Sequence, residues 1–211
     1  MSEELRLDTP RGPAQVSVEH SPGTPRCLVV LTHGAGGGVD AVDLAALAAA
    51  VRRHGAMVAA VTQPYRVAGR RAPGGSPSPQ DEAWRSVVQQ LRAQPGLGAV
   101  PLVVGGRSNG ARVVCRTAAD LGASAVVALA FPLHPPGKPE RSRDAELRLG
   151  RVPRLVVNGG SDPFGVPEAD AGTTVVTRRG ERHDLSRDPD AVAELVVGWL
   201  AERALVDAVS R

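Results

Sequence analysis

The sequence has no isoleucine, only one lysine, at Lys138, and few aromatic residues, which make up 2% of the chain. Nearly all of the positive charge behind the net charge of +3 is therefore arginine, and the bias toward Ala, Gly, Val and Pro is typical of a GC-rich coding sequence. The chain also lacks a basic run interleaved with aromatics, which is the usual mark of a nucleic-acid-binding surface. We therefore expect no nucleic-acid partner, and a core built mostly from Val, Leu and Ala.

Cysteine is almost as scarce, and long apolar runs are missing. Cys27 and Cys115 have no spacing typical of a metal site, so we expect two buried, reduced thiols and no metal or other cofactor. Residues 1–6 are charged and lack the apolar segment of a signal peptide. No window approaches the roughly 18 consecutive apolar residues of a membrane span. The sequence thus predicts a cytoplasmic chain with no membrane partner.

Short apolar segments bounded by Gly, Pro and polar residues recur along the chain and predict strands. Helical patterns separate most of them, with Asp40, Ser78 and Asp188 as the expected N-caps, while 62–77 is expected to be a long loop. This alternation implies a mostly parallel sheet with helices on both faces. We therefore predict a single α/β domain spanning residues 1–211. The predicted strands are residues 14–19, 27–31, 57–61, 101–104, 125–130, 154–158 and 173–177.

The stretch 105–112 follows one of these strands and contains a G-x-S-x-G motif with Ser108 at its centre. The motif indicates a nucleophile only where it lies between a strand and a helix. Here a predicted strand precedes it and apolar residues at helical spacing follow it. In such a turn, small flanking residues let the backbone hold the serine in a strained conformation that exposes its Oγ. Ser108 is therefore the candidate nucleophile, and the alternative is a glycine-rich turn with an ordinary serine.

A serine nucleophile needs a histidine that takes its proton and a carboxylate that orients the histidine. In an open parallel sheet, these groups must lie in the loops after the carboxyl ends of the strands. Asp162 and His183 follow the last two predicted strands, which gives the order Ser, Asp, His expected for this topology. Ser108, Asp162 and His183 are thus the predicted triad. The fallback candidates are the base His134 and the acids Asp170 and Asp188.

The glycine-rich loop 33–38 follows another predicted strand. An oxyanion hole takes one backbone amide from the residue after the nucleophile, here Asn109, and a second from such a loop, where Ala35 is suitably placed. We expect His33 to brace the loop. A phosphate-binding alternative fails because the loop has no G-x-G-x-x-G match, no Walker lysine and no acid at the end of the next strand.

Several motifs together are typical of one family: HGAGG at 33–37, GGRSNGAR at 105–112, FPLHPPGKP at 131–139, DPFG at 162–165 and HDL at 183–185. With them the chain resembles the α/β-hydrolase superfamily, and more narrowly a small lidless bacterial dienelactone-hydrolase-like family related to the hydrolase-like domain of a histone-acetyltransferase-complex subunit. The resemblance spans nearly the whole chain. It implies an α/β-hydrolase fold without a separate cap domain, the triad Ser108, Asp162 and His183, and an oxyanion hole at Ala35 and Asn109.

The chain departs from that family at two points. Dienelactone hydrolases proper use a cysteine where this chain has Ser108, so their substrate is not carried over. Asn109 replaces the apolar residue expected after the nucleophile, which makes the wall of the pocket more polar.

From these observations we expect a metal-independent serine hydrolase of the carboxylesterase type. It would cleave a small-molecule carboxylic ester or thioester through a Ser108 acyl-enzyme, although acyl transfer or perhydrolysis would use the same residues. The alternative is a non-catalytic interaction module on the same fold, which would have no need for Ser, Asp and His in those three loops. The acyl group, the alcohol and the oligomeric state are not predicted. Candidate substrate contacts are His134, Arg66, Arg107 and Phe164.

Overall fold

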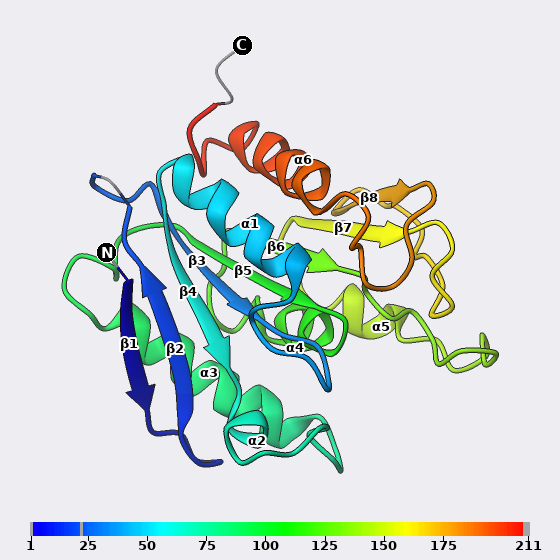
Figure 1. The fold of residues 1–211 in the computed structure, drawn as a ribbon, viewed down its shortest axis with the longest axis horizontal. Coiled ribbons are helices and arrows are strands. Elements are labelled where there is room, and N and C mark those ends of the chain that lie inside the picture. The colour runs from blue at the N-terminus through cyan, green and yellow to red at the C-terminus, as the bar shows by residue number, and fades with distance from the viewer. Residues whose placement is uncertain (1, 22, 209–211) are drawn as a thin grey trace.

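The computed structural model describes residues 2–21 and 23–208 (Figure 1). Its strands, in chain order, are β1 (Ser2–Leu7), β2 (Ala14–Glu19), β3 (Cys27–Thr32), β4 (Ala56–Thr62), β5 (Leu102–Arg107), β6 (Ala125–Leu129), β7 (Arg154–Gly159) and β8 (Thr173–Arg178). They form one eight-stranded sheet in the order β1-β2-β4-β3-β5-β6-β7-β8. Strands β3 to β8 run parallel to one another, while β1 and β2 pair antiparallel at one edge.

Every strand predicted from the sequence is present, with small shifts at its ends, and the mostly parallel sheet is confirmed. The apolar runs are continuous because these strands are covered on both faces, and every residue of β3 and β7 is buried. Strand β1 was not predicted. It is charged and mostly exposed, and its pairing with β2 depends on backbone hydrogen bonds that leave little trace in the side-chain pattern.

Helices cover both faces of the sheet (Figure 1). Helices α1 (Val42–Arg53) and α6 (Pro189–Ala201) pack on one face, and α3 (Ser78–Arg92) and α4 (Asn109–Thr117) pack on the other. Each burial of a Val or Leu side chain contributes roughly 1.5–3 kcal/mol to folding, so the two apolar layers hold the helices in place. Within the described ranges, no helix is long and apolar enough to cross a membrane.

One of the three predicted helix caps is confirmed. The Asp188 side chain accepts a hydrogen bond from the Ala191 amide at the start of α6. The other two predictions are wrong, because Ala41 is the N-cap of α1 and Pro77 is the N-cap of α3. In α1 the carboxylate that meets a first-turn amide belongs to Asp43, whose Oδ1 accepts from Leu44 at 3.0 Å. The expected cap Asp40 lies too early in the chain for this, and Ser78 is already helical.

The loops after the parallel strands meet at one edge of the sheet, where the arrows of β3 and β5 to β8 end (Figure 1). Carboxyl ends of neighbouring parallel strands must lie together, so residues far apart in the chain become neighbours there. The segment predicted as a long loop after β4 contains a short helix, α2 (Pro64–Val67), and the connection after β6 contains α5 (Asp144–Leu147). This edge carries the candidate site.

Candidate active site

Ser108 lies at the sharp turn between β5 and α4, with φ 51° and ψ −113°. A residue other than glycine at positive φ costs on the order of 1–3 kcal/mol, so its surroundings must hold it there. The Ser108 amide donates to the Leu129 carbonyl at 2.9 Å, and the Ser108 carbonyl accepts from the Arg112 amide at 3.3 Å. These bonds tie the turn to β6 on one side and to α4 on the other.

The glycines of the G-x-S-x-G motif are required by close contacts rather than by flexibility. A Cβ on Gly106 would lie 2.5 Å from the carbonyl carbon of Gly110. A Cβ on Gly110 would lie 2.7 Å from the His33 carbonyl oxygen. Both distances are far shorter than a real Cβ contact, so the backbones of β3, β5 and α4 can meet at Ser108 only without side chains.

The three side chains predicted as a triad meet in one hydrogen-bond chain. His183 Nδ1 lies 2.8 Å from Asp162 Oδ2, and His183 Nε2 lies 2.8 Å from Ser108 Oγ. A carboxylate only accepts, so Nδ1 carries the imidazole proton and donates it to Asp162. The unprotonated Nε2 then accepts the hydrogen bond of the Ser108 hydroxyl, which is the arrangement that a general base requires.

Asp162 is held in place by its own loop. Its side chain is fully buried, and Oδ1 accepts from the Phe164 amide at 2.9 Å while Oδ2 faces His183. The Phe164 ring lies against the imidazole of His183, with the ring centroids 4.3 Å apart. The fallback acids are engaged elsewhere, since Asp170 pairs with Arg148 and Asp188 caps α6.

The predicted oxyanion loop passes directly beside the candidate nucleophile, Ser108. A Cβ on Gly34 would lie 3.2 Å from Ser108 Cβ, so only glycine allows the loop to approach this closely. Ala35 follows at the surface, and Asn109 begins α4. Asn109 directly follows Ser108 at a helix start, where backbone amides have no partner within the helix, and Ala35 directly follows Gly34, the loop residue beside Ser108.

A model of the alpha/beta hydrolase domain matches residues 25–184, which include Ser108, Asp162 and His183. The chain belongs to the alpha/beta hydrolase domain family. The resemblance to the α/β-hydrolase superfamily found in the sequence is thus confirmed.

Solved structures of this fold are similar over nearly the whole chain. One is XC6422 from Xanthomonas campestris, a serine hydrolase without a lid, with 21% identity, 99% of this chain and 97% of that chain covered, and a TM-score of 0.77. A dienelactone hydrolase from Anabaena variabilis has 16% identity, covers 96% and 97%, and has a TM-score of 0.79. Est1E from Butyrivibrio proteoclasticus has 14% identity, covers 95% and 98%, and has a TM-score of 0.73. These likenesses show the shared hydrolase fold, and residues 2–21 and 23–208 form one sheet with its covering helices and no separate cap domain, as the sequence predicted.

In this alpha/beta hydrolase, an ion pair that sequence reasoning missed supports the histidine loop. Arg107 Nε donates to Asp43 Oδ2 at 2.9 Å, and another guanidinium nitrogen donates to the His183 carbonyl at 3.3 Å. Asp43 is completely buried, and this burial raises the pKa of its carboxyl, while the Arg107 charge opposes the rise. Arg107 thus connects α1, the nucleophile turn and the loop of His183. A lone aspartate at a helix start gives no local sign of this role.

A second missed residue closes the loop that carries His183. Glu181 is 2% exposed, and its carboxylate accepts from the backbone amides of Arg187 at 3.2 Å and Asp188 at 2.9 Å. A buried carboxylate that receives charge-assisted hydrogen bonds from the backbone fixes the ends of a turn. The loop from 181 to 188 is therefore tied at both ends around His183.

The candidate substrate contacts have different surroundings. Phe164 lies on the His183 ring, and Arg107 is engaged by Asp43. Arg66 lies in α2, where its guanidinium donates to the Arg70 carbonyl. The ring of His134 lies beside Gly165, and its Nδ1 donates to the Pro135 carbonyl at 2.9 Å. Phe164 and Arg107 are thus next to His183, while Arg66 lies in α2 and His134 lies in the connection after β6.

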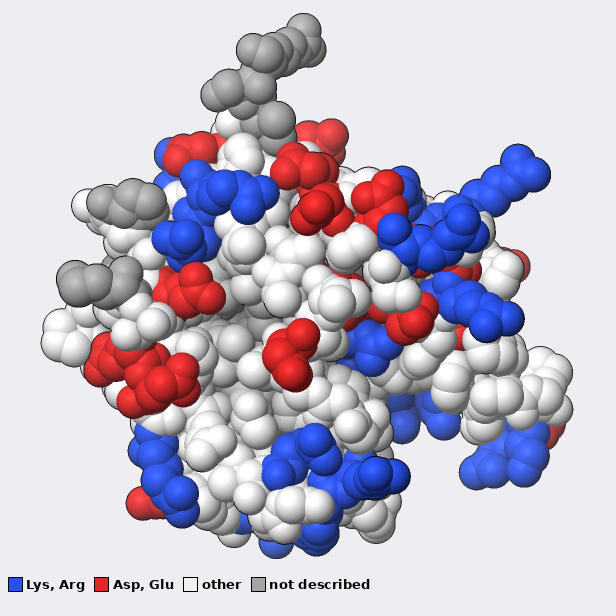
Figure 2. All heavy atoms as spheres, viewed as in Figure 1, with Lys and Arg blue, Asp and Glu red and all other residues white. Residues whose placement is uncertain are grey.

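An open depression of about 530 Å³ lies beside His183 and is lined by Arg107, Ser161, Pro163, Arg182, His183 and Asp184. Figure 2 shows basic side chains gathered around the ends of β7 and β8, with acidic side chains among them. The side chains around the depression carry both signs of charge, so the rim is not uniformly basic. Among residues 2–21 and 23–208, no group of three His, Cys, Asp or Glu is placed to hold a metal ion.

Proposed function

We propose that this chain, acting as one domain, is a metal-independent serine hydrolase that cleaves a small carboxylic ester or thioester. Ser108 is the nucleophile, His183 the general base and acid, and Asp162 the orienting acid. The observation that carries the proposal is the hydrogen-bond chain from Ser108 Oγ through His183 to Asp162, with 2.8 Å at each step. Its geometry suits proton transfer from the serine hydroxyl.

The reaction proceeds in two halves. Ser108 Oγ attacks the carbonyl carbon while His183 Nε2 takes its proton, and the negative oxygen that forms accepts hydrogen bonds from the Ala35 and Asn109 amides. His183 then gives the proton to the leaving alcohol or thiol, which leaves an acyl group on Ser108. Water repeats the sequence with the acyl-enzyme, so that the carboxylic acid departs and the serine is restored. These groups supply every proton transfer and the charge stabilisation, so the proposal needs no metal ion.

The similar proteins favour an ester bond as the target. They include a serine hydrolase, an esterase domain and a dienelactone hydrolase, and Est1E has a structure with ferulic acid, a carboxylic acid, bound to it. A carboxylic acid is the product class that an acyl-enzyme releases to water. The depression beside His183 is open enough to receive the leaving alcohol, which must lie near the imidazole that protonates it.

The test is steady-state hydrolysis of p-nitrophenyl acetate and of a matched thioester by the native protein and by Ser108→Ala, with and without a metal chelator. We expect turnover by the native protein that the chelator leaves unchanged, and background rates for the variant. Native rates in Ser108→Ala would contradict the proposal. A native protein without turnover on any ester or thioester would instead favour the interaction module.

A further inference from the structure

The guanidinium of Arg107 lies between loops of the candidate active site. Arg107 ends β5 and directly precedes Ser108, so its side chain leaves the backbone at the nucleophile turn. Its Nη2 donates to the His183 carbonyl at 3.3 Å, and a Cβ on Gly34 would lie 3.5 Å from its Nη1. One side chain therefore joins the turn of the nucleophile to the loop of the base and lies close to the predicted oxyanion loop.

Asp43 fixes the direction of this guanidinium. Arg107 Nε donates to Asp43 Oδ2 at 2.9 Å, and Asp43 Oδ1 accepts from the Leu44 amide at 3.0 Å at the start of α1. The Asp43 side chain is 1% exposed, and that of Arg107 is 16% exposed. Because the guanidinium is planar and rigid, a carboxylate that holds one of its nitrogens also restricts where the others lie. Asp43 thus aims Nη2 at the His183 carbonyl.

The contact matters because of what else holds His183. Within the part of the chain that the structure describes, the bond from Arg107 is the only hydrogen bond that the His183 backbone makes. The ring of His183 lies 2.8 Å from Asp162 Oδ2 and 2.8 Å from Ser108 Oγ. A ring follows the backbone that carries it, so a shift of the His183 backbone would lengthen the contact between Nε2 and Oγ.

General-base catalysis depends on that contact. Proton transfer needs a separation of about 2.6–3.2 Å, and a displacement of about 1 Å can cost on the order of 10²-fold in rate. Given the proposed hydrolase function, on which this step rests, we propose that Arg107 is a positioning residue that keeps His183 Nε2 within reach of Ser108 Oγ. Arg107 acts through the His183 carbonyl, and Asp43 acts through Arg107.

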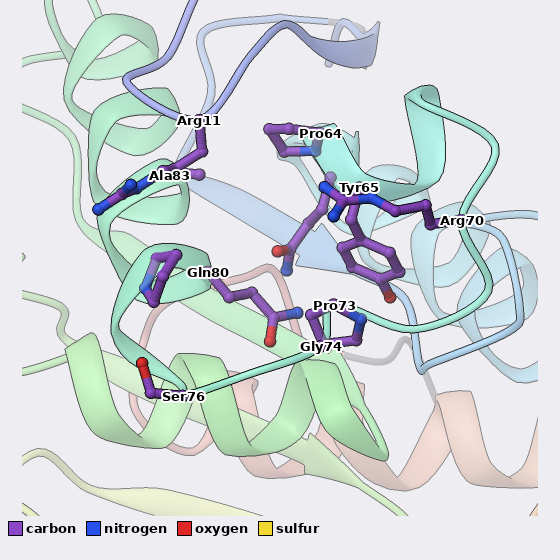
Figure 3. Close-up of a pocket in the computed structure, with 11 residues that line it drawn as sticks. Arg11, Pro64, Tyr65, Arg70, Pro73, Gly74, Ser76, Gln80 and Ala83 are labelled. Atoms are coloured by element: carbon purple, nitrogen blue, oxygen red, sulfur yellow. The ribbon is translucent and has the colours of Figure 1, made fainter.

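The oxyanion loop has a second neighbour, which does not reach His183. Tyr65 Oη lies 3.5 Å from His33 Nδ1, and Figure 3 shows Tyr65 at a small cavity between α2 and the start of α3. The residues that line this cavity include neither Arg107 nor His183. The contact between Arg107 and the base is thus separate from the contacts of Tyr65, and its test is confined to Arg107 and Asp43.

The alternative is that Arg107 only neutralises the buried carboxylate of Asp43. Lysine separates the two roles, because its ammonium supplies a charge for Asp43 but lacks the planar fork that reaches a second acceptor in a fixed direction. Arg107→Lys should therefore retain most of the stability while it loses the hold on His183. A purely stabilising role predicts instead that stability and turnover change together.

The test measures kcat and KM for p-nitrophenyl acetate, together with the midpoint of urea unfolding. We expect Arg107→Met to lower kcat on the order of 10²-fold with a nearly unchanged KM, and Arg107→Lys to lower kcat at least about tenfold with a near-native urea midpoint. The fall in kcat is expected whichever half of the reaction limits turnover, because His183 transfers the proton in both. A rise in KM alone would make Arg107 a substrate contact and overturn the proposal.

The decisive variant combines Arg107→Met with Asp43→Leu. Removing the uncompensated carboxylate should restore part of the urea midpoint, but the His183 carbonyl is still not held, so kcat stays low. Arg116→Met is the matched control. Arg116 lies 2.6 Å from Asp81 in a similarly buried ion pair between α4 and α3, on the other face of the sheet. This variant should lower the urea midpoint and keep native kcat.

The outcomes separate this proposal from the general one. If kcat recovers with the urea midpoint in the double variant, or if Arg107→Lys keeps native kcat, Arg107 only stabilises the fold and the hydrolase function stands. Arg107→Lys keeps the test valid should Arg107→Met not fold.

A native protein that hydrolyses no ester would overturn the hydrolase function, and the positioning role would then be measured by fluorophosphonate labelling of Ser108 in the same variants. Equal labelling rates in the native protein and in Arg107→Lys would overturn the positioning role. A Ser108 that never labels would overturn both proposals.

Discussion

Two histidines follow parallel strands of the same sheet, His33 after β3 and His183 after β8, and they lie on opposite sides of Ser108. His33 has no exposed surface, and both of its ring nitrogens bond to backbone groups, the Gln63 amide and the Gly34 carbonyl. The His183 side chain is 21% exposed, and both of its nitrogens face side chains, the Asp162 carboxylate and the Ser108 hydroxyl.

The partners of a ring, more than its position, decide what it can do. A backbone amide does not give up its proton, so His33 can only brace the loop that it occupies. A serine hydroxyl can give up its proton to a ring whose cation a carboxylate stabilises, and His183 has both partners. The sequence places both histidines at the same edge of the sheet, and on the basis of their different contacts we propose different roles for them.

The largest contrast is expected from removing each ring. His183→Ala should lower turnover on p-nitrophenyl esters by on the order of 10⁶-fold, and Ser108→Ala with His183→Ala should cost no more than either change alone, because the triad acts as a unit. His33→Gln should lower kcat by at most about 10²–10³-fold, the cost of a displaced oxyanion donor. Equal losses in kcat for His183→Ala and His33→Gln, measured on folded protein, would contradict the different roles proposed for the two histidines.

The carboxylate partner gives the next largest effect. Asp162→Asn keeps the size of the side chain but presents an amide to His183 Nδ1, and it should cost on the order of 10⁴-fold in kcat by analogy with the protease case. Asp188→Asn is the matched control, since Asp188 caps α6 and should retain nearly native turnover. A loss below tenfold for Asp162→Asn would assign the orienting role to another acid.

The support beneath His183 can be weakened without touching the triad. Arg107→Met leaves the Asp43 carboxylate buried without its partner, which should lower the free energy of unfolding by about 3–5 kcal/mol. Adding Asp43→Leu should restore part of this loss, because the uncompensated charge is then gone. Urea unfolding of Arg107→Met, of Asp43→Leu and of the double variant measures the coupling free energy between the two side chains. Strictly additive losses would mean that the pair does not act as a unit.

The smallest effect concerns pH. Burial lowers the pKa of the His33 imidazole below its ordinary value of 6.5, so near that pH the unfolded chain binds the proton more readily than the folded chain. His33 therefore contributes stability that is fully present above pH 6.5 and is lost as the pH falls below it, by at most about 1.4 kcal/mol per pH unit. Urea unfolding between pH 5 and 8 should show a steeper acid loss in the native protein than in His33→Gln. The same slope in both would assign the loss to other groups.

Much of this arrangement could be predicted from the sequence because it depends on local patterns. Continuous apolar runs mark strands that are covered on both faces, and the motif around Ser108 fits one kind of turn. The positions of Asp162 and His183 follow from the rule that functional loops lie after the carboxyl ends of parallel strands.

The remainder depends on contacts between distant segments. Asp43 meets Arg107 across 64 positions of sequence, and Gln80 meets Asn109 across 29, and neither pairing has a local signal. The wrong caps, Asp40 and Ser78, fit the local pattern as well as the true ones do. Strand β1 escaped prediction because its charged sequence contributes backbone pairing and little burial.

The most direct test of the account is labelling with a fluorophosphonate probe, located by peptide mass spectrometry. The native protein should gain one adduct, on Ser108, because His183 activates that hydroxyl and Asp162 orients the imidazole. His33→Gln should still label, whereas Ser108→Ala should not and His183→Ala should label far more slowly. A native protein whose Ser108 stays unlabelled, or a His183→Ala variant that labels at the native rate, would contradict the assignment of His183 as the base.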